Sequence, residues 1–266
     1  MGDNKNIIQK TKLIKMANKL LKKLEITGIL TLETGLHIGG TNSSMSIGGI
    51  DKAVIRNPLN NQPFIPGSSL KGKMRSLLEI STGNIGGRSG GVVHNGPSSR
   101  LGIDGQPSAA DLFGNAINDG QKPSRIIVRD LSLINHKALL AKTEIPYTEG
   151  KTEVVIDRIT SAAMPRQNER VPAGAQFKLN LVVNIWEQDI HSQNQLLGLL
   201  FSSLQLLTDD YLGGHGSRGY GQVSIEVTDM VEKGSDTYYN AEAADGISIK
   251  AAWQQQINRL QSKNLA

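Results

Sequence analysis

The chain has 266 residues, 38% of them hydrophobic and 20% charged, a balance that predicts an ordinary soluble fold with one substantial core. It contains no cysteine, which excludes disulfide bonds and thiolate zinc sites and is compatible with a cytoplasmic location. It also has no apolar run of the roughly 18 to 20 residues that a membrane span needs. Lysine and arginine number 29 against 24 aspartates and glutamates, so we expect an anionic partner, with nucleic acid ahead of an anionic membrane surface.

The glycine and aromatic contents indicate how such a partner would be held. The chain has 29 glycines but only 4% aromatic residues. Stacking platforms for bases are therefore few, and backbone amides and cations must supply most of the contacts.

Residues 1–23 are expected to form a basic N-terminal extension. Residues 5–24 carry seven lysines together with an apolar face at helical spacing, which predicts a basic amphipathic helix. Such a helix is either an electrostatic or membrane-surface arm or, as we favour, a solvated face packed on a neighbour.

The residues that follow predict a mixed α and β domain over residues 24–228. Alternating apolar and β-branched residues predict strands, and apolar residues at helical spacing predict helices. The expected elements, in chain order, are a strand at 24–34, a glycine-rich loop, a strand at 53–56 closed by the Asn57-Pro58 turn, a helix at 67–80 capped by Ser68 and Ser69, strands at 124–130 and 176–187, a helix at 193–207, and a strand at 222–227. Residues 229–266 are expected to be a C-terminal tail with a short helix.

Two insertions interrupt this order. Residues 81–108 are rich in glycine, serine and asparagine without a sustained period, which predicts a long surface lid. The polar stretch 143–172 predicts a protruding β-hairpin. The expected fold class is therefore α+β, a ferredoxin-like or RRM-like sheet with helices on one face, a lid insertion and a hairpin insertion.

The loop from Asp210 to Gly221 has five glycines in nine positions, so its backbone amides can approach a phosphate chain closely, with Arg218 as a bidentate partner. The purely structural interpretation is a helix C-cap followed by a tight turn. No Gly-Lys-Ser/Thr sequence ends the loop, which disfavours a mononucleotide-binding enzyme.

The segment from Pro66 to Arg75 places a glycine and two serines at a helix N-terminus, where free amides attract anions. Lys71 and Arg75 lie four residues apart on one face of this helix. They indicate either an anion site or a solvated basic face, and the residues alone leave both open.

Two further residues have open interpretations. Asp51 is a lone carboxylate in a glycine-rich loop, where a turn-forming aspartate is the ordinary interpretation. His37 either contacts RNA or fills its loop. The histidines lack metal-ligand spacing, so no zinc site is expected.

Six motifs together resemble the Csm-type backbone subunit of type III-A CRISPR effector complexes, a branch of the RAMP superfamily. They are E-T-G-L-H-I-G-G (33–40), I-G-G-I-D (47–51), I-P-G-S-S-L-K-G-K-M-R-S-L-L-E (65–79), D-L-F-G (111–114), I-D-R-I-T-S-A-A-M-P-R-Q-N-E-R (156–170) and Y-L-G-G-H-G-S-R-G-Y-G (211–221). The resemblance implies an RRM-like palm, a lid, and a thumb hairpin that folds over a guide–target duplex. It also implies partners: crRNA, target RNA, further copies of the chain and other subunits of the complex, with no membrane.

The resemblance places the family's catalytic aspartate on Asp51, which would bind Mg²⁺ or Mn²⁺ together with RNA or would act as a general base. Target RNA would then be cut at regular intervals by a metal-dependent endoribonuclease. A non-catalytic RNA scaffold, in the same or a type III-B complex, is the alternative. The residues expected to bind RNA are His37, Gly39, Gly40, Ser68, Ser69, Lys71, Arg75, Arg158, Met164, Pro165, Arg166, Arg170, Gly216, Ser217, Arg218 and Tyr220.

Overall fold

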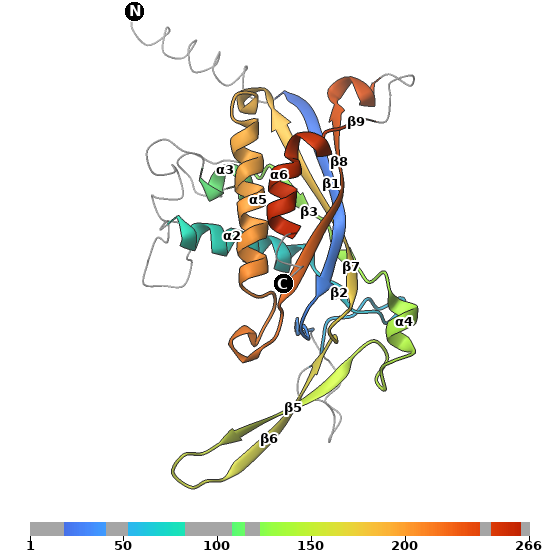
Figure 1. The fold of residues 1–266 in the computed structure, drawn as a ribbon, viewed down its shortest axis with the longest axis vertical. Helices are drawn as coiled ribbons and strands as arrows, with labels where there is room; N and C mark the ends of the chain where they lie inside the picture. The colour runs from blue at the N-terminus through green and yellow to red at the C-terminus, as the bar shows by residue number, and fades with distance from the viewer. Residues whose placement is uncertain (1–18, 41–52, 83–107, 115–122, 240–245, 262–266) are drawn as a thin grey trace, which may run out of the picture.

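The computed structural model describes residues 19–40, 53–82, 108–114, 123–239 and 246–261 (Figure 1). The expected lid lies almost wholly outside these ranges, as do Asp51 and residues 1–18 of the N-terminal extension.

An antiparallel sheet forms the centre of the molecule. Strand β1 (Leu20–Leu32) lies between β7 (Gln176–Trp186) and β8 (Val223–Gly234). Two short strands extend the sheet, β3 (Ile126–Val128) beside β7 and β9 (Ile247–Ser248) beside β8. Every pairing in this sheet is antiparallel.

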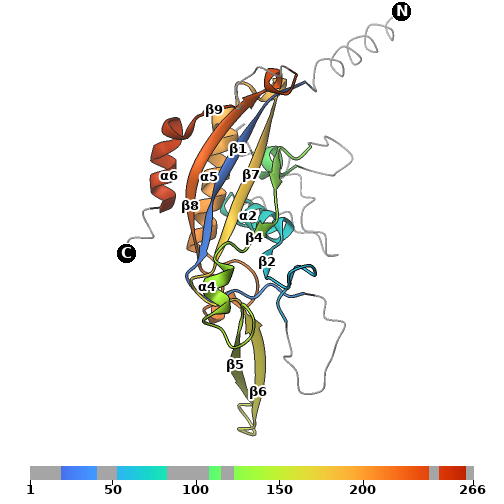
Figure 2. The same cartoon turned by 90° about the vertical axis from the view of Figure 1, so that its right-hand side faces the viewer.

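Helices cover one face of the sheet. Figure 2 looks onto the opposite face of β8, β1 and β7, with α2 (Gly67–Ser81) and α5 (Gln193–Asp209) behind them. Alternate β1 side chains, including Leu24, Ile26 and Leu30, are fully buried, whereas the intervening ones are partly exposed. This period of two is what a strand with a single packed face requires.

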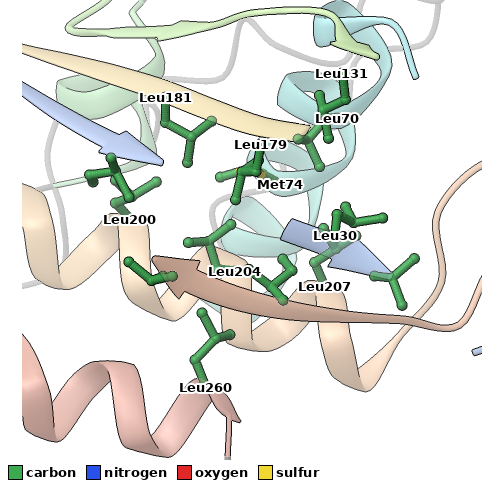
Figure 3. Packing of buried hydrophobic residues seen from close by; sticks show 14 of the residues in the cluster. Leu30, Leu70, Met74, Leu131, Leu179, Leu181, Leu200, Leu204, Leu207 and Leu260 are labelled. Carbon is green, nitrogen blue, oxygen red and sulfur yellow. The ribbon is translucent and has the colours of Figure 1, made fainter. Parts of the chain in front are cut away.

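Leucines supply most of the core between sheet and helices. Figure 3 shows Leu30, Leu179 and Leu181 of the sheet facing a group of side chains from α2 and α5 that includes Leu70, Met74, Leu200, Leu204 and Leu207. Each is fully buried, and burying a leucine or methionine stabilises the fold by about 1.5–3 kcal/mol.

The elements β1, α2, β3, β7, α5 and β8 follow the expected order of strand, helix, two strands, helix and strand. The prediction of a mixed α and β fold with an antiparallel sheet is confirmed. A short helix, α3 (Ala109–Phe113), packs against α2 and α5.

Three local expectations were wrong. Residues 20–23 belong to β1, because pairing with β7 and β8 on both sides outweighs their helical spacing. Residues 53–56 form only isolated bridges, Gly39 with Val54 and Arg56 with Pro63. Ser68 and Ser69 do not cap α2, which begins after Pro66 and has the Asp130 carboxylate accepting the Gly67 N–H at 2.7 Å.

The expected hairpin is present. Strands β5 (Glu149–Ile156) and β6 (Ala163–Arg170) pair with each other alone and project from the end of the body that carries β2 (Phe64–Ile65), β4 (Leu131–Ser132) and α4 (His136–Leu140) (Figure 1).

The C-terminal segment is part of the core. The boundary expected after residue 228 lies inside β8, and α6 (Gln254–Gln261) packs on α5 and β8 through buried Ile257 and Leu260. The Trp253 ring stacks on Phe201 with centroids 5.6 Å apart. Within the described ranges, no helix has both the length and the hydropathy to cross a membrane.

We predict that Trp253→Ala lowers the free energy of unfolding by about 3 kcal/mol, because it removes a large ring from the α5–α6 contact. Denaturant unfolding followed by circular dichroism measures this. Tyr239→Ala is the control, since that ring is 84% exposed, and should change stability by less than about 0.5 kcal/mol. Equal stability of both variants would show that the C-terminal segment is not part of the cooperative core.

Candidate nucleic-acid interface

Three segments meet where the hairpin leaves the body, and we call this place the hairpin junction: residues 33–40, residues 53–56 and the glycine loop 211–222. The first segment joins the hairpin through reciprocal backbone bonds of 2.8 Å between Leu36 and Val171. It joins the glycine loop through Gly214 N–H to the His37 carbonyl at 2.8 Å and Gly221 N–H to the Gly35 carbonyl at 2.9 Å.

The Glu169 carboxylate ties the junction together. It is buried on β6 and accepts hydrogen bonds from the Val54 N–H at 2.9 Å, the Thr148 hydroxyl at 2.7 Å and the Arg56 guanidinium at 2.6 Å. Burial opposes ionisation of this group, but the bonds from Thr148, Arg56 and Val54 outweigh it and lower its pKa. Glu169 is therefore a buried anion whose donors come from two separate parts of the chain.

Arg56 and His37 extend this network. Arg56 also donates to the carbonyls of Asn61 and Pro146, each at 2.9 Å. The His37 ring donates from Nδ1 to the Glu169 carbonyl at 2.7 Å, because a carbonyl can only accept. His37 is buried and fills the junction in the described conformation, while a contact of its side chain with RNA stays a prediction.

Asp51 lies outside the described residues, but the chain on both sides of its segment is placed. Gly40 N–H donates to the Ala53 carbonyl at 3.1 Å, and Ile55 N–H donates to the Ile38 carbonyl at 2.9 Å. The described chain therefore ends at Gly40 and resumes at Ala53 within the hairpin junction.

The glycine loop is held by close contacts. A Cβ on Gly216 would overlap the Tyr211 ring. A Cβ on Gly213 would overlap the His37 carbonyl, and the φ of Gly213 is +76°. Glycine is required at these positions for packing alone. The tight-turn interpretation is thus confirmed, while phosphate binding by the loop stays a prediction.

Charged groups of the hairpin and the glycine loop converge on Glu153 of β5. Its carboxylate lies 3.5 Å from the Arg218 guanidinium, 3.8 Å from the Lys151 ammonium and 4.0 Å from Nδ1 of His215. Partial burial acts to raise the pKa of Glu153, but the neighbouring Tyr220 hydroxyl, His215 and the two cations bring it below its ordinary value. Glu153 is an anion surrounded by positive groups.

Tyr220 lies beneath this cluster. Its ring is 1% exposed and is covered by the Lys151 ammonium at 4.4 Å and the Arg170 guanidinium at 5.1 Å from the centroid. Arg170 is also paired with Glu149 at 2.6 Å. In this conformation the ring supports the cations above it, and a contact of Tyr220 with RNA stays a prediction.

The basic residues of α2 have partners within the chain. Lys71 donates to the Ser124 hydroxyl at 2.8 Å, and burial, followed by the nearby Arg75, lowers its pKa. Arg75 is paired with Glu79 at 2.7 Å. Asp130 takes the place at the helix N-terminus where a phosphate was expected.

The predicted RNA-binding residues thus fall into three places. The hairpin carries Arg158, Met164, Pro165, Arg166 and Arg170. The junction carries His37, Gly39, Gly40, Gly216, Ser217, Arg218 and Tyr220. Helix α2 carries Ser68, Ser69, Lys71 and Arg75.

Sequence reasoning missed Arg56, Thr148, Glu153 and Glu169, which hold the junction together. The sequence offers one local signal for the role of Glu169: it is a polar residue at an inward position of the predicted hairpin. Within the described ranges, no three His, Cys, Asp or Glu side chains gather in a way that could hold a metal ion.

We predict that Glu169→Gln destabilises the protein by about 3 kcal/mol at neutral pH, because the Arg56 charge loses its buried partner. The lowered pKa of Glu169 means that its contribution is present above the ordinary value of 4.5 and is lost as the pH falls through the folded-state pKa. The difference between wild type and variant should therefore shrink on acidification, as measured by urea unfolding at several pH values.

Glu232→Gln is the matched control. Glu232 pairs with Lys22 at 3.0 Å, but both side chains are partly exposed, so its loss should cost less than about 1 kcal/mol. A Glu169 effect no larger than this would contradict the central position of the carboxylate.

A family model described as the RAMP superfamily matches residues 29–224. A Streptococcus thermophilus protein named CRISPR system Cms endoribonuclease Csm3 is 40% identical over 204 residues, covering 77% of this chain and 87% of that protein. A Methanocaldococcus jannaschii protein of the same name is 36% identical over 254 residues, covering 93% and 96%.

Solved structures agree with these relatives. A chain in the crystal structure of a Csm3–Csm4 subcomplex of the type III-A CRISPR-Cas interference complex has a TM-score of 0.53 and 27% identity, over 91% of this chain and 97% of that one. The Methanopyrus kandleri Csm3 crystal structure has a TM-score of 0.60 at 20% identity, over 92% and 88%, which shows a shared fold.

Proposed function

Because this chain belongs to the RAMP superfamily, and within it to the Csm3 subunits of type III CRISPR systems, we propose that it binds a guide RNA and cleaves the target RNA paired with it. Its partners are crRNA, target RNA, further copies of itself and other subunits of the effector complex.

One observation carries this proposal. Gly40 and Ala53, the described residues on either side of the segment that contains Asp51, lie at the base of a projecting hairpin, beside a glycine loop and a cluster of cations. In this proposal Asp51, a phosphate-binding surface and a hairpin that distorts the RNA act together at this end of the molecule.

The hairpin is the proposed thumb. Its Met164 side chain is 53% exposed and precedes Pro165, so the pair offers an apolar wedge to a nucleic-acid duplex. We infer that the wedge unstacks one target nucleotide and turns its 2′-hydroxyl in line with the adjacent phosphorus.

Cleavage would then be an internal transesterification. The 2′-oxygen forms a bond to phosphorus, the bond to the 5′-oxygen of the next nucleotide breaks, and the products are a 2′,3′-cyclic phosphate and a 5′-hydroxyl. Asp51 either takes the proton of the 2′-hydroxyl or, as we favour, helps to hold a hydrated Mg²⁺ or Mn²⁺ with the RNA phosphates. Such an ion would stabilise negative charge on the cleaved phosphate.

We predict that Asp51→Ala abolishes cleavage of a matched target RNA by the assembled complex and leaves guide and target binding unchanged. The carboxylate repels phosphate, so its removal does not weaken RNA binding. Cleavage is followed on labelled target RNA with Mg²⁺, with Mn²⁺ and with a chelator, and binding by gel shift. Cleavage that persists in the variant would leave a non-catalytic scaffold, the alternative function.

We predict that Arg218→Gln weakens RNA binding by the chain and reduces the slope of log affinity against log salt by about 0.7, the loss of one phosphate contact with a single strand. The Arg218 side chain is 61% exposed and can therefore reach a phosphate. Lys22→Gln is the control, because Lys22 lies near the other end of β1 and is paired with Glu232. Equal slopes in the two variants would move the RNA path away from the glycine loop.

A further inference from the structure

Many of the cations assigned to RNA already have a carboxylate partner within the chain. Arg170 pairs with Glu149 at 2.6 Å and Arg75 with Glu79 at 2.7 Å, while Arg218 shares Glu153 with Lys151. A phosphate can engage these cations only by displacing or joining an acidic side chain. Each carboxylate in these pairs is therefore a possible competitor of RNA.

Glu153 differs from the other carboxylates in this set. Its basic neighbours come from two elements, since Lys151 belongs to β5 whereas His215 and Arg218 belong to the glycine loop. In the hairpin register it also lies opposite Arg166, another residue assigned to RNA. Groups from two separate elements that converge on one anion make the kind of site that binds a phosphate oxygen.

The distances indicate a loosely held carboxylate. The three charged contacts of Glu153 measure 3.5–4.0 Å, whereas the pairs of Arg170 and Arg75 measure 2.6–2.7 Å. Arg218 is largely exposed. The pair between Glu153 and the exposed Arg218 is long, so breaking it costs the fold little.

We propose that Glu153 occupies the position of a guide-strand phosphate in the RNA-free chain and competes with RNA for the cations of the hairpin and the glycine loop. This inference rests on the proposed function and makes Glu153 a specificity determinant. RNA that engages the hairpin and the loop together displaces the carboxylate, whereas RNA that touches only one of them does not.

The test compares Glu153→Gln with wild type in the full-length chain. Binding of a fluorescein-labelled oligouridylate is measured by anisotropy over a series of NaCl concentrations. Removing one repelling charge close to a phosphate should raise affinity about fivefold, and the freed cations should steepen the salt slope by about 0.7 for one added contact.

Two controls separate competition from other effects. Glu153→Asp keeps the charge and should retain wild-type affinity. Glu232→Gln removes an equal charge from the ion pair with Lys22, remote from the junction, and should leave affinity unchanged. Thermal melting of each variant verifies that it is folded.

The outcomes distinguish this inference from the proposed function. Unchanged or weaker binding by Glu153→Gln, or an equal gain in Glu232→Gln, would overturn the competitor role while the RNA-binding function stands. Wild-type chain and Glu153→Gln that both fail to bind RNA at low salt would overturn the proposed function and the competitor role together.

Discussion

The burial of one carboxylate constrains the whole end of this protein that we propose to face RNA. Glu169 can remain ionised away from water only because donors from Val54, Arg56 and Thr148 surround it. Those donors belong to residues 53–56, a segment that follows Asp51, and to the entry of the hairpin. The hydrogen bonds that solvate the Glu169 charge therefore fix these two segments relative to each other. The sheet forms the rigid base of this end of the molecule, and the ion network aligns the two segments on it.

Around Glu169 the charged side chains form ion pairs within the chain, and some of these pairs are held more loosely than others. Buried pairs such as Arg125 with Asp189 are bidentate and hold the body of the fold. The contacts of Glu153 at the junction are longer, and Arg218 is more exposed, so a polyanion can reach this cation. Ion pairs thus hold the fold where they are buried and, in the proposed function, offer cations to RNA where they are exposed.

Much of the fold could be predicted because its information is local. Periods of two and 3.6 residues indicated β1, α2, β7 and α5. The helical spacing of residues 20–23 misled because the two neighbouring strands are distant in sequence, and Ser68 lost its capping role to Asp130 for the same reason. Arg56 and Glu169 are 113 residues apart, so no local pattern joins them. The role proposed for Asp51 came from family resemblance, since a lone aspartate in a loop carries no chemical signature of its own.

The exposed outer half of the hairpin affects the self-association of the subunit when no RNA is bound. Val154, Ile156, Ile159 and Met164 all expose more than half of their surface, and no described element of the chain covers them. An apolar two-stranded ribbon in water promotes self-association between its own copies. The concentration at which the free chain remains dispersed would then depend on the supply of nucleic acid that shields this ribbon, and overproduction without it would yield aggregates in place of monomers.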